Sequence, residues 1–382
     1  MNAYITDIAS FLPNDPVDND EMEKILGMVN DLPSRTKKII LRNNGIKHRY
    51  YAIDPATGRT THTNAQLAAE AVKNLQPYAG FTVNDIELLS CGTSAPDQFM
   101  PGHASMVHGE VGGKKCETVS TAGVCLSGIS CLKYACMSVA LGLTNNAVAT
   151  GSEQSSSFMR SKMCGTVDPK RAEKLEKQPA LAFEADFLRW MLSDAAGAVF
   201  IAPKPVKNRL NLKIEWIEIL SHANELESCM YAGAIKEADG RLKGWREFDS
   251  LEESINANSL MVKQDAKLLN REIIPVTVSR SLPRYIEKYE LKAEQIDWFL
   301  PHYSSEYFRQ IIYDHLKEID FEIPEERWFS NLTEKGNTGS ASIYIILEEI
   351  LKSGKLKKGD RLLCFIPESG RFSVGYMMMT VV

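Results

Sequence analysis

Short apolar runs alternate with helix-like patterns along the whole chain. Apolar runs bounded by turn residues predict strands at Ala3–Ile8, Ile86–Cys91, Thr118–Ser120, Asn146–Gly151, Ala196–Ile201, Leu212–Leu220, Trp298–Pro301 and Arg361–Ile366. Apolar residues with helical spacing predict helices over Asn64–Leu75, Cys125–Leu143, Lys263–Tyr289, Glu306–Glu318 and Ser340–Ser353. This alternation predicts an α/β layered fold.

The chain also repeats itself weakly. "NDIELLSCGTS" (84–94) is similar to "EQIDWFLPHYSS" (294–305), and each is followed by a second strand–turn–helix unit, "ETVSTAGVCLSG" (117–128) and "ERWFSNLTEKGNTGSAS" (326–342). We therefore expect a duplicated α/β unit with two pseudo-symmetric halves, residues 1–205 and 206–382.

Two stretches, 165–190 and 222–262, are more polar and less regular than the rest. Long connections in such folds either cover active sites or form solvated surface insertions. The sequence leaves both interpretations open.

Composition narrows the class of protein. The 382 residues are 44% hydrophobic and 24% charged, with a formal net charge of −5, which argues against broad binding to nucleic acid or anionic membranes. The N-terminus does not resemble a secretion signal, and without an apolar run of about 18 residues we expect no membrane span. Eight scattered cysteines without a C-x-x-C pair argue against a metal site or disulfide framework and favour the cytoplasm.

Three cysteines lie close together in "STAGVCLSGISCLKYAC". Cys125 follows a predicted strand and a small-residue turn and opens a helix, where free N–H groups and the helix dipole favour a thiolate of low pKa. Cys131 and Cys136 lie further along among apolar residues and are interpreted as packing residues. Considered alone, Cys125 suits a nucleophile or a packing role equally.

Two polar residues are candidate partners for a nucleophile. His302 follows the predicted strand in "DWFLPHYSS", and the carboxyl ends of strands are where open α/β sheets build their sites. Asn337 lies in "KGNTGSAS", between glycines that permit an unusual backbone path or a close ligand approach. Because this turn is the counterpart of the Cys125 turn, the two should converge at the centre of a pseudo-symmetric fold.

Together these phrases resemble the thiolase-fold condensing enzymes, specifically their ketoacyl-acyl-carrier-protein synthase III branch. "STAGVCLSG", "LPHYSSEYF" and "KGNTGSAS" are similar to the three motifs of that family's Cys–His–Asn set. "NNGIKHRY" (43–50), "GTSAPDQFMPG" (92–102) and "LSDAAGAVFI" (192–201) match further family motifs in the same order. The resemblance covers nearly the whole chain and implies a thiolase-like αβαβα layered fold.

The resemblance also implies roles for individual residues. Cys125 would attack an acyl thioester and hold the acyl group, and its backbone N–H would form half of an oxyanion hole. His302 and Asn337 would donate hydrogen bonds to the enolate of a second thioester, malonyl or β-ketoacyl, and a Claisen condensation would follow. Phe99 would reach into the acyl tunnel of a second subunit, so a homodimer is implied. No cofactor is needed, because acyl carrier protein or CoA carries the substrates.

This sequence departs from the family pattern at two places. The C-terminal glycine run of the family is replaced by "PESGRFSVG", in which Gly370 remains and Arg371 follows it. Arg371 could supply a backbone donor, bring its guanidinium to a substrate oxygen, or form an ion pair with Glu368. A tryptophan that stacks on the adenine of CoA is absent near residues 33–42, where Arg35, Lys37, Lys38 and Arg42 instead suit an acidic acyl carrier protein.

Several alternative functions share parts of this pattern. Hydroxymethylglutaryl-CoA synthases need a glutamate near residue 94, where this chain has Ser94, and degradative thiolases need a second catalytic cysteine, whereas Cys364 lies in an apolar strand pattern. A papain-like or thioester hydrolase also uses Cys, His and Asn, but the duplicated pattern argues against it. A non-catalytic subunit would usually lose the cysteine. Among condensing enzymes, a fatty acid initiator and a dialkylresorcinol-type enzyme remain, and the "PESGRF" ending favours the specialised group.

Overall fold

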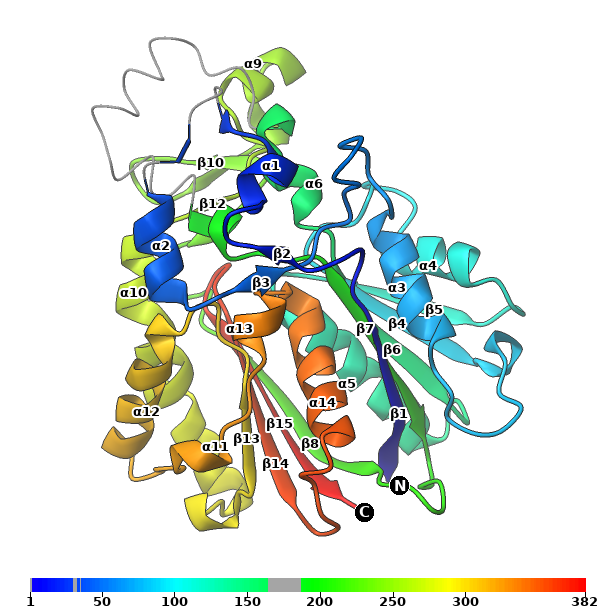
Figure 1. The fold of residues 1–382 in the computed structure, drawn as a ribbon. Helices are drawn as coiled ribbons and strands as arrows, with labels where there is room; N and C mark the ends of the chain where they lie inside the picture. The colour runs from blue at the N-terminus through cyan, green and yellow to red at the C-terminus, as the bar shows by residue number, and fades with distance from the viewer. Residues whose placement is uncertain (1, 30–32, 35, 164–186) are drawn as a thin grey trace.

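The computed structural model describes residues 2–29, 33–34, 36–163 and 187–382. Nine strands form one sheet in the order β13-β14-β15-β8-β1-β7-β6-β4-β5 (Figure 1). They are β1 (Ala3–Phe11), β4 (Leu88–Thr93), β5 (Glu117–Ala122), β6 (Ala147–Glu153), β7 (Ala195–Ala202), β8 (Leu212–Ser221), β13 (Trp298–Pro301), β14 (Arg361–Glu368) and β15 (Ser373–Val381). All eight predicted strands are present, and β15 is the one strand of this sheet that was not predicted.

The order and sense of strand pairing repeat between the two ends of this sheet. From β1 outward, β7 and β6 are antiparallel to their predecessors, and β4 is parallel to β6. From β8 outward, β15 and β14 are likewise antiparallel, and β13 is parallel to β14. The two series join where β1 pairs with β8. This repetition supports the predicted duplication, while the division at residues 205 and 206 stays a prediction.

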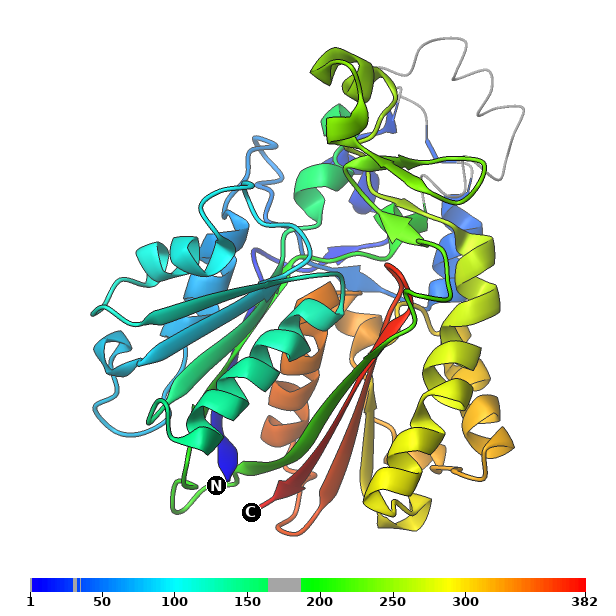
Figure 2. The same ribbon diagram turned by 180° about the vertical axis from the view of Figure 1, so that it is seen from behind.

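Helices form the other layers. Two of them, α5 (Leu126–Leu141) and α14 (Ser342–Lys352), lie between the two series of strands, because α5 contacts β4 to β6 and also β14 and β15, and α14 contacts both β1 and β13 (Figures 1 and 2). The outer layer on the N-terminal series is α3 (Asn64–Lys73) with α4 (His103–Val111). The outer layer on the C-terminal series is α10 (Ala266–Ile274), α11 (Leu282–Tyr289) and α12 (Tyr307–Glu318). The result is the expected αβαβα layering.

The helix predicted over Lys263–Tyr289 is divided into segments in the structure. Residues 263–289 are not a single helix, because α10 ends at Ile274, a π-helix spans Pro275–Arg280, and α11 starts at Leu282. Pro275 cannot donate a backbone hydrogen bond and sits where α10 stops. The chain stays helical through the π-helix, so the prediction was wrong in expecting one uniform helix.

Smaller elements lie above the sheet edge in Figure 1. They are β2 (Val17–Asp18), α1 (Met22–Leu26), α2 (Lys37–Asn44), β3 (His48–Arg49), α6 (Ser156–Met159), β9 (Met230–Tyr231), β10 (Ala234–Lys236), β11 (Leu242–Gly244), α9 (Leu251–Asn256), β12 (Lys263–Gln264) and α13 (Leu332–Lys335). The polar stretch 222–262 thus contains short strands and a helix. The other polar stretch, 165–190, lies mostly outside the described residues, which omit 164–186. None of the helices in the described ranges is long and apolar enough to cross a bilayer.

Candidate active site

Three parallel strands of the N-terminal series end at one edge of the sheet. Because β4, β5 and β6 run parallel, their carboxyl ends lie together. Ser94 follows β4, Cys125 follows β5 after a short turn, and Glu153 is the last residue of β6. A hydroxyl, a thiol and a carboxyl group are therefore delivered to the same edge.

The C-terminal series delivers two more polar groups. His302 follows β13, and its backbone N–H donates to the carbonyl of Phe365 on β14 (2.8 Å). Asn337 follows α13, and its backbone pairs with the segment before β7, through Asn337 N to the Met191 carbonyl and Ser193 N to the Asn337 carbonyl (both 2.9 Å). Both residues are thus fixed through the main chain and leave their side chains for other contacts.

Cys125, His302 and Asn337 line one narrow cavity of about 60 Å³. The structure therefore brings together the three side chains on which the sequence analysis depended. The remaining lining residues are Ser94, Val124, Glu153, Ser155, Phe158, Leu188, Met191, Leu192, Met230, Gln264, Leu269, Ile273, Ile274, Tyr303, Ser304, Phe308, Gly339, Pro367 and Ser369. Met230 comes from the polar stretch 222–262, so this stretch contributes to the cavity.

Glycines, which have no side chain, allow the Cys125 turn and the Asn337 turn to lie close together. A Cβ on Gly128 of α5 or on Gly151 of β6 would lie 2.2 Å from the Ser340 carbonyl oxygen, far inside contact distance. We call this contact of Gly128, Gly151 and Ser340 the glycine seam. It presses the start of α5 and β6 against the segment that follows Asn337, as the pseudo-symmetry predicted.

Cys125 is the N-cap residue of α5, as predicted, but its pKa moves in the unexpected direction. Burial raises the pKa of the thiol, and the carboxyl groups of Glu368 and Glu153 raise it further. The helix terminus was expected to lower it, and the enclosing protein and two acids outweigh that contribution. The free thiol is therefore protonated at neutral pH and would have to lose its proton in any nucleophilic attack.

His302 is held in its uncharged form. It is 4% exposed, and burial lowers its pKa to about 4. A neutral imidazole carries one N–H donor and one acceptor nitrogen, so it can donate a hydrogen bond or take a proton.

Asn337 has an oriented side chain. Its Oδ1 accepts a hydrogen bond from the Gly339 N–H (3.0 Å), which leaves Nδ2 as the donor on the cavity side. Gly336 and Gly339 flank it with φ of 70° and 52°, in the region that favours glycine. The expected unusual backbone path is therefore present. A Cβ on Gly339 would lie 2.8 Å from Cγ of Glu153, so the close neighbour of this glycine is a side chain of the protein.

Glu153 was not predicted. It is 3% exposed, and its Oε1 accepts hydrogen bonds from Ser94 N (3.0 Å), Ser94 Oγ (2.6 Å) and Ser340 N (3.2 Å). Burial raises its pKa to about 7. The sequence contains Ser94 where related chemistry would place an acid, and the neighbouring strand supplies a carboxyl group against that serine. The available signal was "ATGSEQ", an acid at the carboxyl end of an apolar strand.

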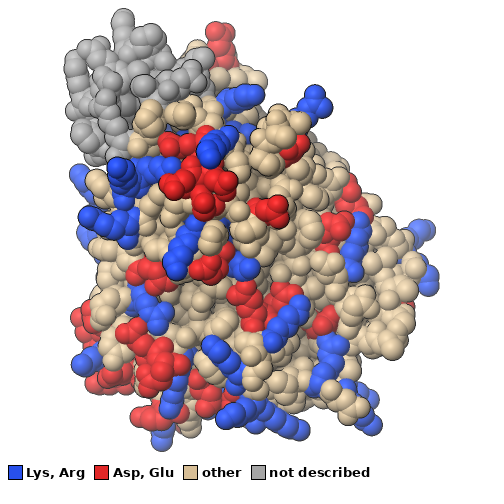
Figure 3. All heavy atoms as spheres, viewed as in Figure 1, with Lys and Arg blue, Asp and Glu red and all other residues tan. Residues whose placement is uncertain are grey.

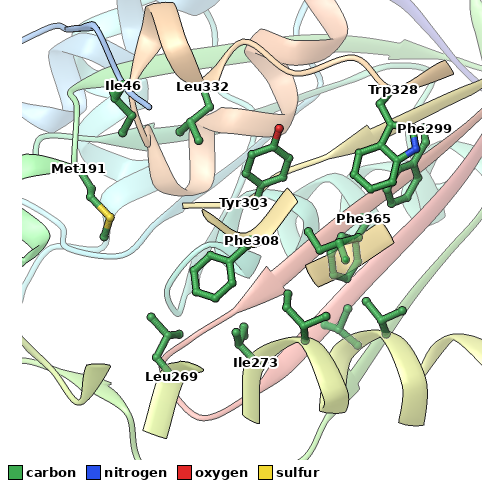
Figure 4. Close-up of a cluster of buried hydrophobic side chains, with 14 of the residues drawn as sticks. Ile46, Met191, Leu269, Ile273, Phe299, Tyr303, Phe308, Trp328, Leu332 and Phe365 are labelled. Atoms are coloured by element: carbon green, nitrogen blue, oxygen red, sulfur yellow. The ribbon is translucent and has the colours of Figure 1, made fainter. Parts of the chain in front are cut away.

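One side of the cavity is apolar. Met191, Leu269, Ile273, Tyr303 and Phe308 line it and belong to a large cluster of buried side chains (Figure 4). Figure 4 shows Leu269 and Ile273 on α10 facing the ring of Phe308 on α12. We call these five residues the apolar wall. It suits a hydrocarbon chain, since it offers little hydrogen bonding.

The turn after β14 places its residues differently from the prediction. Gly370 and Arg371 are not among the residues that line the cavity, whereas Ser369 is. The N–H groups of Gly370 and Arg371 donate to the Glu368 carboxylate, and Arg371 Nε donates to the Leu226 carbonyl (3.0 Å). Gly370 nevertheless approaches the cysteine turn closely, because a Cβ there would lie 2.9 Å from Val124.

Phe99 and the expected basic rim lie on the surface. Phe99 is 74% exposed and stacks on Trp245 (5.4 Å between ring centroids), outside the cavity. Lys37 is paired with Glu23 (3.2 Å), Lys38 and Arg42 are exposed, and Arg35 lies outside the described residues. Acidic and basic side chains are interspersed over the face shown in Figure 3. Among the described residues, no group of three or more His, Cys, Asp and Glu could hold a metal ion.

Comparison with known proteins gives three consistent results. The family model for the C-terminal part of 3-oxoacyl-[acyl-carrier-protein (ACP)] synthase III matches residues 286–379. The beta-ketoacyl-[acyl-carrier-protein] synthase III of Clostridium perfringens is 26% identical over 363 residues, which cover 95% of this chain and 94% of that relative. Among solved structures, AbyA1, a tetronic acid condensing enzyme, superposes with a TM-score of 0.75 at 20% identity, covering 99% of each chain. OleA from Xanthomonas campestris also gives 0.75, at 18% identity, covering 100% of this chain and 98% of OleA. These two likenesses show the fold.

Proposed function

We propose that this chain, a member of the ketoacyl synthase III branch of the thiolase-fold condensing enzymes, joins two acyl units by Claisen condensation, with one unit held as a thioester on Cys125. The observation that carries the proposal is the shared cavity of Cys125, His302 and Asn337. The enzyme is thus an acyltransferase that forms a carbon–carbon bond.

The first step transfers an acyl group to Cys125. Its sulfur attacks the thioester carbonyl of the donor, and the bond between that carbonyl and the carrier sulfur breaks. Because the Cys125 thiol is protonated at rest, it gives up its proton during attack. The neutral imidazole of His302, which lines the same cavity, can accept this proton and pass it to the departing carrier thiolate.

The second step forms the new bond. The enolate forms when a malonyl thioester loses carbon dioxide or a β-ketoacyl thioester loses a proton from its α-carbon. It attacks the acyl-Cys125 carbonyl, and the Cys125 thiolate leaves. The N–H of His302 and Nδ2 of Asn337 would stabilise the enolate oxygen, which commonly lowers such barriers by about 3 kcal/mol per donor.

The oxyanion hole for the acyl-Cys125 carbonyl is proposed to use two backbone amides. The N–H groups of Cys125 and Ser369 donate to no other described residue, and both residues line the cavity. Since the Gly370 and Arg371 amides are bonded to Glu368, Ser369 is the better second donor. Gly370 then acts by letting the turn approach Val124.

The substrates are proposed to be acyl chains carried as thioesters, on acyl carrier protein in preference to CoA. The apolar wall supports an acyl substrate, and the exposed cations Lys38 and Arg42 on α2 support an acidic carrier. Fatty acid biosynthesis or a specialised lipid or polyketide pathway, such as one of dialkylresorcinol type, would use this reaction. The seven described cysteines are all free, which supports the cytoplasm as its location.

A homodimer is also proposed. Strand β5 is at the edge of the sheet, with unpaired backbone groups on one side. Large apolar side chains are exposed near it, at Phe99 (74%), Met137 (47%), Leu141 (66%) and Leu143 (73%). A second subunit covering this edge would bury them.

Intact mass measurement tests the proposed function. The enzyme is incubated with a panel of acyl thioesters on carrier protein and on CoA, and the adduct mass identifies the donor. We expect the adduct to disappear in Cys125→Ser and to persist in Cys136→Ser, a control cysteine of similar exposure on the same helix. An adduct that survives in Cys125→Ser, or free acid as the main product, would contradict the proposal.

A further inference from the structure

The mechanism above leaves one buried acid of the cavity without a task. Glu153 lines the cavity together with Cys125, His302 and Asn337. It comes from β6, between the strands that deliver Ser94 and Cys125 to the same edge. Burying a carboxyl group almost fully costs folding free energy, because its charged form loses hydration. Such a group beside Cys125 is therefore a candidate for a role in the reaction.

The carboxylate is held firmly by one of its two oxygens. Three hydrogen bonds to Glu153, two from Ser94 and one from the Ser340 N–H, end on Oε1. Oε2 is then the oxygen available to a ligand in the cavity. Such an arrangement orients an acid–base group, because the anchored oxygen fixes where the other oxygen points.

The charges around the cavity also suit a proton acceptor. Among the described residues that line it there is no lysine or arginine, and the other titratable groups of this lining, the Cys125 thiol, the His302 ring and the Tyr303 hydroxyl, are uncharged at neutral pH. Without a countercharge, burial raises the pKa of Glu153 to about 7, where a general base can both take and return a proton. A second carboxylate entering the cavity would meet Glu153 and find no cation among the described lining residues.

We propose that Glu153 is the base that takes a proton from the α-carbon of the second substrate, and that this substrate is an acyl or β-ketoacyl thioester with hydrogen, not a carboxylate, on that carbon. The proposal rests on the condensation proposed above. The α-carbon–hydrogen bond breaks, its proton goes to Oε2, and its electron pair forms the enolate. The enolate attacks acyl-Cys125, the thiolate leaves, and Glu153 returns the proton to sulfur. No carbon dioxide is released, and no further reactant is needed.

A purely structural role for Glu153 makes a different prediction. By holding Ser340, the carboxylate also steadies the turn that carries Asn337. Loss of that support would slow condensation with every second substrate equally. Loss of a base would slow only those substrates whose α-carbon must lose a proton.

The experiment compares three second substrates on enzyme already charged with its acyl donor. Malonyl-, 3-oxooctanoyl- and octanoyl-carrier protein are offered to the wild type and to Glu153→Gln, and products and carbon dioxide are quantified. Glu348→Gln is the matched control, because Glu348 is also a buried glutamate bonded to a serine hydroxyl, that of Ser10, but does not line the cavity. The wild type is also assayed with second substrates deuterated at the α-carbon.

We expect the wild type to condense at least one uncarboxylated substrate without releasing carbon dioxide and with a primary deuterium isotope effect. Glu153→Gln should still acquire the acyl group on Cys125 but lose about 100-fold or more of this condensation. Glu348→Gln should stay within about threefold of the wild type.

Three results would overturn the inference. They are an undiminished rate in Glu153→Gln, an equal loss with malonyl and uncarboxylated substrates, or a wild type that uses only malonyl and releases one carbon dioxide per product. In the last case condensation itself would stand. Absence of product from all three substrates, despite an acyl group on Cys125, would instead overturn the proposed function. If the variant fails to fold, the isotope effect on the wild type still tests the substrate part of the inference, because it reports whether the α-carbon–hydrogen bond breaks.

Discussion

The two series of strands end in the same residue type but use it differently. Glu153 ends β6 and Glu368 ends β14, and these strands occupy equivalent places in the repeated pairing order. Both acids are buried, and both raise the pKa of Cys125. Glu153 accepts hydrogen bonds from Ser94, which follows β4, and from the segment after Asn337. Glu368 accepts hydrogen bonds from the N–H groups of its own turn, at Gly370, Arg371 and Ser373.

The difference indicates how a duplicated fold divides its chemistry. A carboxylate satisfied within its own turn stabilises that turn, while one that joins separate segments beside the cavity is placed for reaction. In the mechanism proposed above, the N-terminal series contributes the reactive sulfur and the base, and the C-terminal series contributes the donors His302 and Asn337. The following predictions test this division.

The largest effect is expected from the donors. His302→Ala and Asn337→Ala should each lower the condensation rate about 100- to 1,000-fold, because each removes a hydrogen bond to developing negative charge. Asn337→Ala should still acquire the acyl group, as seen by intact mass, since the sulfur comes from the other series. If Asn337→Ala could not be acylated at all, the division between the series would be wrong.

The second-largest effect is expected in the pH dependence of stability, to which Glu153 contributes. Its folded pKa of about 7 lies above the ordinary value of 4.5, so the protonated side chain favours the folded state, fully below pH 4.5 and progressively less up to pH 7. Between these values the wild type should lose about 3 kcal/mol of unfolding free energy relative to Glu153→Gln. His302 and Glu368 titrate in both proteins and cancel in the difference. Urea unfolding from pH 4.5 to 8 measures it, and parallel curves would contradict the prediction.

A smaller effect is expected at Glu368. Glu368→Gln keeps the size of the side chain but turns an NH₂ group toward amides that need an acceptor, and should cost about 1–3 kcal/mol of unfolding free energy. Condensation by the folded variant should fall far less than in Glu153→Gln. A loss of activity as large as that of Glu153→Gln would mean that the two acids are not functionally different.

The smallest effect is expected at Arg371. Its guanidinium donates to the Leu226 carbonyl at the surface and forms no ion pair with Glu368, the pairing considered from the sequence. Arg371→Ala should change stability by less than about 0.5 kcal/mol and leave rate and product profile as in the wild type. A changed product profile would contradict this prediction and indicate that the Arg371 side chain contacts the substrate.

Local patterns were sufficient to predict most of the fold and the central residues. The positions of the strands could be predicted from apolar runs because both faces of this sheet are covered by helices. The three motifs led directly to Cys125, His302 and Asn337. The long helix over 263–289 was wrong because its apolar spacing continues through Pro275, which stops α10.

Two aspects of the site could not be read in advance. The direction of the Cys125 pKa depends on burial and on Glu153 and Glu368, which are close to it only in the folded chain. Glu153 itself looks like any acid after a strand until β4 and the segment after Asn337 close around it. Tertiary packing, which sequence spacing does not encode, decides both.

The glycine seam and the apolar wall are built from different parts of the chain. Gly128 and Gly151 leave no room for an extra atom beside the Ser340 carbonyl. A larger residue at either position would therefore move the Cys125 sulfur away from the Asn337 side-chain amide. Leu269, Ile273 and Phe308, by contrast, come from α10 and α12 and can change size without touching that contact. If the apolar wall holds the acyl chain as proposed, substitutions in it would change the accepted chain length and leave the arrangement of Cys125 and Asn337 unaltered.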